Sequence, residues 1–88
     1  MNTLEILKKS HSQDRSRDWE EIRDLITSDP DVMDGLPVFK GTRIPVYIVL
    51  DYLAEGVGTD QILKDYPSLS PGKIRAALRF ANLLTAIH

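Results

Sequence analysis

The sequence contains no cysteine and only two histidines, and both shortages exclude whole classes of function. Without a thiol, the chain can form neither a disulfide nor a thiolate nucleophile. The two histidines, His11 and His88, cannot build a histidine-based metal cluster. We therefore expect the protein to bind no metal ion and to need no cofactor.

Enzyme signatures and long apolar runs are also missing. The sequence has no P-loop, no nucleophile elbow and no dinucleotide fingerprint, and carboxylate pairs such as Glu20 with Asp24 are typical of a solvated helix face. Near the start, the longest apolar run, Leu4 to Leu7, is interrupted by Glu5 and is far too short for a signal peptide or a membrane span. These absences predict a cytoplasmic protein that is not an enzyme.

The 88-residue chain is short enough for a single domain, since typical domains have roughly 100 to 150 residues. No apolar side chain occurs between Lys8 and Asp18, so that stretch has nothing with which to anchor to a core. We predict a mobile arm over residues 1–17 and one folded domain over residues 18–88. A domain this small hides only about 60 to 65% of its unfolded surface, which favours a state shared with a partner.

The first predicted element of the domain is a helix over residues 19–26. Asp18 and Glu21 have the spacing of a capping box, and Trp19 shares one helix face with Ile22. A β-ribbon is expected next, because residues 30–46 hold three prolines and two glycines among short apolar pairs. Its two expected hairpin turns are Asp34–Gly35 and the weaker Lys40–Gly41–Thr42.

The remaining sequence has the pattern of a helix-turn-helix. A helical period over residues 46–55 ends at Gly56, Thr59 is expected to cap a short second helix, and Ser70 is expected to cap a third. Leu69 has the position of the apolar residue that fills the corner between the last two helices. The predicted fold is therefore mainly α-helical, with a trihelical helix-turn-helix core, winged or homeodomain-like, preceded by a short β-ribbon and an N-terminal helix.

Charge is distributed unevenly along the chain, whose total net charge is −2. Residues 1–37 carry a net charge of −4, whereas residues 70–88 carry three basic and no acidic side chains. If Ile74, Leu78 and Ala81 face the core, an outer line of the last helix can contact DNA. The candidate DNA-binding residues are Lys73, Arg75, Arg79 and Asn82. Alternatively, these basic residues belong to an ordinary solvated face.

The sequence also has more apolar surface than a small trihelical core can cover. The residues in excess form a candidate partner or dimer interface. They are Ile48, Tyr52, Phe80, Leu83, Leu84 and Ile87. In the alternative interpretation, the helix that carries Trp19 packs over these residues and hides them.

Several short motifs together resemble a prokaryotic family of small uncharacterised domains, domain of unknown function four-three-three. The resemblance covers about residues 26–82 and rests mainly on the segments Gly41-Thr42-Arg43-Ile44-Pro45-Val46 and Tyr66-Pro67-Ser68-Leu69. It implies a helix-turn-helix fold and, for many members, an antitoxin role with a small PIN-like nuclease as the toxin. It also implies that Gly35, Gly41, Thr42 and Arg43 are structural residues that shape the ribbon.

Two functions follow as hypotheses. The first is an antitoxin-like autoregulator of a type II toxin–antitoxin pair, which binds operator DNA as a homodimer and neutralises a cognate PIN-like nuclease toxin. The alternative is a protein-interaction module with a trihelical core and no role in DNA binding. The motifs identify neither the operator nor the toxin, and they do not assign a role to residues 1–25.

Overall fold

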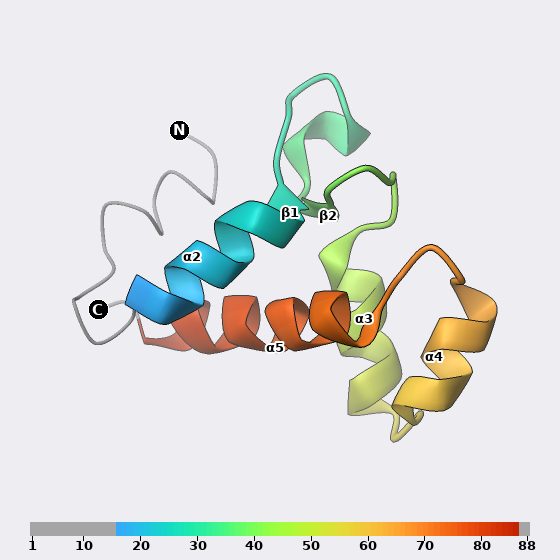
Figure 1. The fold of residues 1–88 in the computed structure, drawn as a ribbon. Coiled ribbons are helices and arrows are strands. Elements are labelled where there is room, and N and C mark those ends of the chain that lie inside the picture. The colour runs from blue at the N-terminus through green and yellow to red at the C-terminus, as the bar shows by residue number, and fades with distance from the viewer. Residues whose placement is uncertain (1–15, 87–88) are drawn as a thin grey trace.

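The computed structural model describes residues 16–86, and it describes side chains from Trp19 onward (Figure 1). The fold is mainly helical with a small two-stranded antiparallel sheet. The elements are α2 (Ser16–Leu25), β1 (Ile26–Thr27), a 3-10 turn (Met33–Gly35), β2 (Val38–Phe39), α3 (Val46–Ala54), α4 (Thr59–Asp65) and α5 (Pro71–Thr85). None of the helices in this described part is long and apolar enough to cross a membrane.

The N-terminal helix is displaced from its predicted position. It begins at Ser16 and ends at Leu25, so Asp18 lies inside α2 and is not its cap, and Ile26 belongs to β1. Ile26 leaves the helix because it pairs with Phe39 across the sheet, where both side chains are buried. The predicted arm over residues 1–17 lies outside the described residues except for Ser16 and Arg17, which belong to α2.

The ribbon forms, but only its weaker turn signal marks a hairpin. Phe39 donates a backbone hydrogen bond to Ile44 of 3.0 Å, so residues 40–43 make the turn, with Gly41 at φ +82°. The prediction of a hairpin at Asp34–Gly35 is wrong, because this pair lies in the 3-10 turn. Pro37 has no amide proton with which to continue a ladder beyond that turn. Gly35, at φ +85°, occupies the left-handed region that favours glycine.

Helix α5 is the centre of the domain and packs against α2, α3 and α4 (Figure 1). Its buried face is wider than predicted, because α2 covers one side of it. The buried residues of α5 are Ile74, Ala76, Ala77, Phe80 and Leu83. The expectation that Leu78 faces the core is wrong, since this side chain is 49% exposed, whereas Ala76, two residues earlier, is fully buried. Leu69 is buried at the corner between α4 and α5, as predicted.

The two predicted helix caps differ in outcome. Ser70 Oγ accepts a hydrogen bond of 3.2 Å from the backbone amide of Lys73, so it caps α5 as predicted. Thr59 is the first residue of α4. The cap position before it is occupied by Gly58, and no side chain forms a capping hydrogen bond there. The prediction for Thr59 is therefore wrong.

This difference gives a paired prediction for stability. Ser70→Ala is expected to lower the free energy of unfolding by about 1 kcal/mol, because it leaves a helix amide without its partner. Thr59→Ala should change it by less than about 0.5 kcal/mol, since alanine is the better helix former and no capping bond is lost. Urea denaturation of both variants measures the difference. Equal losses would contradict the capping assignment.

Candidate functional site

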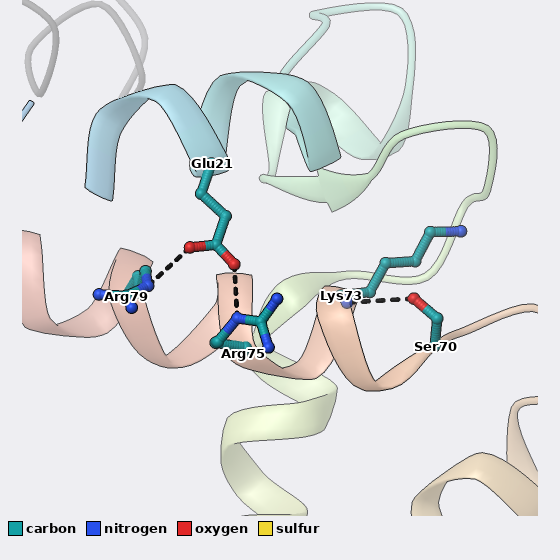
Figure 2. A network of polar contacts seen from close by, with 5 residues as sticks. All are labelled: Glu21, Ser70, Lys73, Arg75 and Arg79. Atoms are coloured by element: carbon teal, nitrogen blue, oxygen red, sulfur yellow. Dashed lines mark hydrogen bonds and ion pairs between the residues drawn. The ribbon is translucent and has the colours of Figure 1, made fainter. Parts of the chain in front are cut away.

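One carboxylate holds two of the candidate DNA-binding residues. Glu21, on α2, points toward α5, where its two oxygens lie 2.7 Å from Arg75 Nε and 2.7 Å from Arg79 Nε (Figure 2). The two arginines are one helical turn apart on α5, so they share the face that looks toward α2. The Glu21 side chain is 21% exposed, and the hydrogen bond that it accepts from Arg75 Nε is charge-assisted and so stronger than a neutral one, while Arg79 adds an ion pair. Glu21 therefore links α2 to α5.

The other two candidate DNA-binding residues lie apart from this contact. Lys73 is at the start of α5, where its Nζ donates a hydrogen bond of 3.0 Å to the carbonyl of Ser68. Asn82 is exposed toward the C-terminal end of the helix. On the same helix as Glu21, Glu20 and Asp24 are exposed, and Asp24 lies 3.8 Å from Arg23. The basic face predicted from the sequence is thus bordered and partly neutralised by an acidic helix, which works against attraction of a polyanion.

The predicted apolar interface is divided between the core and the surface. Phe80 and Leu83 are 4% and 1% exposed and belong to the core, so the expectation of an exposed interface is wrong for these two. The physical reason is α2, whose Ile22 joins the same core cluster. Leu84 is 40% exposed, and Ile48 and Tyr52 are half-buried on α3. Ile87 lies outside the described residues.

An apolar groove opens where the segment before β2 meets α3 and α5. It has a volume of about 190 Å³, and its lining residues are Leu36, Pro37, Val46, Tyr47, Leu50, Phe80 and Leu84. Phe80 and Val46 are almost fully buried and form the floor, while Leu36 (42%), Tyr47 (50%) and Leu84 keep large exposed fractions. Leu36 and Tyr47 were not among the residues predicted for an interface. The available signal was that Tyr47 lies off the apolar stripe of its helix.

A second hollow lies between α3 and α4 and has a mixed lining. This α3/α4 cleft, of about 200 Å³, is lined by Ile48, Asp51, Tyr52, Glu55 and Tyr66. The rings of Tyr52 and Tyr66 meet edge to face, with centroids 6.1 Å apart. The cleft therefore combines aromatic surface with two carboxylates.

Asp65, at the end of α4, orients one wall of the α3/α4 cleft. Tyr52 donates its hydroxyl to Asp65 at 2.8 Å, and Gln61 Nε2 donates to the other carboxylate oxygen of Asp65 at 2.9 Å. The hydrogen bond to Asp65 raises the pKa of Tyr52 above its ordinary value of 10.0, because it favours the protonated phenol. Tyr52 is thus held by a neighbour on α4 and is not a free donor in the cleft.

The loop before α3 contains the last group of predicted residues. Thr42 closes the turn, because its Oγ1 donates to the carbonyl of Phe39 at 2.7 Å and accepts from the amide of Ile44 at 3.0 Å. Arg43 is exposed and, among residues 16–86, makes no hydrogen bond or ion pair. Arg43 therefore forms no bond to the described backbone of the loop, and the structural role that the family resemblance implies for it stays a prediction.

No metal centre is visible in the described residues. Between residues 16 and 86, histidines, aspartates and glutamates do not gather into a group of three or more that could hold a metal ion. The polar groups that do converge, Glu21 with its two arginines and Asp65 with its two donors, bind one another. The candidate functional sites among residues 16–86 are therefore the face of α5, the apolar groove and the α3/α4 cleft.

These observations place the chain in the class of small, mainly helical domains. A two-stranded ribbon precedes the three packed helices α3, α4 and α5, and the additional helix α2 covers α5. The chain belongs to the family described as "Protein of unknown function (DUF433)", whose match covers residues 26–81. The family resemblance drawn from the sequence motifs is thus confirmed.

The chain is also similar to two particular proteins. "Uncharacterized protein y4eO" of Sinorhizobium fredii (strain NBRC 101917 / NGR234) is 40% identical over 71 residues, which cover 81% of this chain and 32% of that protein. The chain thus spans about a third of that relative. A crystal structure of a DUF433 member protein from Anabaena variabilis ATCC 29413 has the same fold, with a TM-score of 0.64 and 24% sequence identity. The similarity covers 93% of this chain and 88% of that one.

Proposed function

We propose that this protein is a protein-interaction module, and that its partner binds in the apolar groove between the segment before β2, α3 and α5. The observation that carries the proposal is the exposure of Leu36, Tyr47 and Leu84 around a floor of buried side chains. Large apolar side chains grouped around a hollow usually mark a binding surface. A partner segment with one or two apolar side chains would fill the groove and remove these three from water.

The charge around α5 supports this choice over DNA binding. Both arginines predicted to contact DNA already face Glu21, and the same side of α5 is bordered by the acidic helix α2. To reach phosphate, Arg75 and Arg79 would have to exchange a carboxylate at 2.7 Å for a partner that the neighbouring acids repel. The groove, by contrast, is open among residues 16–86 without any rearrangement of them.

Co-expression with the product of the neighbouring reading frame tests the proposal, with a PIN-like nuclease toxin as the expected partner. Leu84→Lys or Tyr47→Lys should reduce co-purification of the partner by about tenfold or more, because each puts a charge into an apolar contact. Leu78→Lys is the matched control, since Leu78 is an equally exposed leucine on α5 that does not line the groove. A wild-type chain that does not co-purify, or equal binding by all three variants, would reject the proposal.

DNA binding in an antitoxin-like dimer is the second candidate. It is favoured by the exposure that remains on the arginines, since the side chains of Arg75 and Arg79 are still 61% and 42% exposed. In this candidate function, Lys73, Arg75, Arg79 and Asn82 contact operator DNA, and release of Glu21 is part of the binding step. Glu21→Gln, which removes the charge that both arginines face, tests this candidate.

A further inference from the structure

The exposed ridge of α3 and the loop before it have opposite charges at their two ends. Arg43, three residues before α3 begins, is exposed and makes no hydrogen bond or ion pair within the described residues. Asp51 and Glu55, at the other end, are exposed and line the α3/α4 cleft. Lys64 is the single basic residue between positions 44 and 72, so this part of the surface is otherwise acidic.

The spacing of these residues is self-complementary. Tyr47, Asp51 and Glu55 follow one another at intervals of four, which in a helix places them along one ridge, and Arg43 lies in the loop before the start of that ridge. If two copies of α3 lie antiparallel around a two-fold axis, the loop with Arg43 at the start of one helix comes to the end of the other, where Glu55 lies, and Tyr47 faces Asp51. Within one chain the nine-residue helix, about 14 Å long, separates Arg43 from Glu55.

We propose that a second copy of this chain docks here, with α3 antiparallel to α3 and with Arg43 of each copy entering the α3/α4 cleft of the other. The lining of the cleft suits a guanidinium group. Glu55 and Asp51 supply the opposite charge, and the rings of Tyr52 and Tyr66 supply aromatic faces on which an arginine side chain packs. The contact is isologous, so every attraction occurs twice.

Apolar contact and charge both contribute to the proposed dimer. Exposed ion pairs alone contribute little to association, so the affinity depends on Tyr47, which is 50% exposed, and on the half-buried Ile48 beside it. The ion pairs fix the antiparallel direction, because a parallel arrangement would bring Arg43 next to Arg43 and Glu55 next to Glu55. A second copy thus accounts for both the exposed arginine and the acidic cleft.

Sedimentation equilibrium of the full chain and of two charge reversals tests the dimer. The wild type is expected to reach the mass of a dimer with rising concentration. Arg43→Glu alone and Glu55→Arg alone should each weaken self-association by about tenfold or more, because each turns two attractions into two repulsions. An equimolar mixture of the two variants should form a heterodimer of wild-type affinity, since both contacts are then between opposite charges.

Matched controls separate this contact from a general effect of charge. Lys64→Glu and Asp60→Arg make the same charge changes at exposed positions of α4 that do not line the cleft, and both should still dimerise. Circular dichroism confirms that each variant is folded. A monomeric wild type, dimers that survive either reversal, or a mixture that stays monomeric would each overturn the proposal. Tyr47 lines the groove and also lies in this contact, but neither charge reversal changes a groove residue, so their results are distinct from the loss of partner binding expected for Leu84→Lys.

Discussion

Leu83→Ala is expected to lower the free energy of unfolding by about 2–5 kcal/mol, whereas Leu84→Ala should lower it by less than about 1 kcal/mol. The two residues are neighbours on α5 and undergo the same chemical change, so helix propensity cancels from the comparison. They differ in burial, since Leu83 is 1% exposed and Leu84 is 40% exposed. The larger loss is severe for a small domain whose total stability is about 5–15 kcal/mol.

Guanidinium denaturation, extrapolated linearly to water, measures this pair of variants. The expected pattern is a large loss of stability for Leu83→Ala with no separate effect on partner binding, and the reverse for Leu84→Ala. If both variants were as stable as the wild type, Leu83 would be a surface residue, as the sequence alone suggested. The pair therefore tests the packing of α2 on α5, which buries Leu83 in the same cluster as Ile22.

Glu21→Gln is expected to lower the free energy of unfolding by about 1–2 kcal/mol. The substitution keeps the size of the side chain and removes the charge that attracts both Arg75 and Arg79. The estimate lies below the full value of two charge-assisted contacts because the side chains of Arg75 and Arg79 are 61% and 42% exposed, so water screens part of the attraction. Glu20→Gln is the matched control, since Glu20 is exposed on the same helix, and its effect should be close to zero.

Salt provides the second measurement for Glu21. The difference in stability between the wild type and Glu21→Gln should shrink as ionic strength rises, because screening weakens the ion pairs that only the wild type has. A difference that does not change with salt would mean that Glu21 acts through packing. Thermal or urea unfolding at two salt concentrations decides between these outcomes.

The same variant tests DNA binding as the second candidate function. If Arg75 and Arg79 contact phosphate, Glu21→Gln should raise affinity for duplex DNA, since the competing carboxylate is gone. Arg75→Ala combined with Arg79→Ala should reduce the dependence of binding on salt by about one unit of slope per lost contact. If neither variant changes binding to DNA, the α5 arginines have a structural role and this candidate is rejected.

The sequence predicts most reliably where local chemistry decides the structure. The period of α3, the hydroxyl of Ser70 before Pro71 and the apolar corner residue Leu69 are local signals, and each has the predicted place in the structure. The prediction that Thr59 caps α4 is wrong for a local reason as well, because the preceding Gly58 occupies the cap position. Local residue patterns of this kind are thus enough to predict the order of the helices in this domain.

The sequence does not indicate which helix faces pack against one another. Whether Leu78 or Ala76 faces inward depends on the side of α5 that α2 covers, and no local signal in α5 contains that information. The partner of the two arginines was hidden for the same reason, because Glu21 precedes Arg75 by 54 residues. The groove combines residues from three separate segments, so periodicity within any one of them does not indicate it.

The position of α2 has a consequence for the limits of this domain. The family match begins at residue 26, directly after α2 ends, so homology and cooperative folding define different units in this chain. The side of α5 that is buried here requires Ile22 and Glu21, which both precede the matched region. A relative that shares only the matched region must therefore cover that side of its last helix with a different segment or with another molecule.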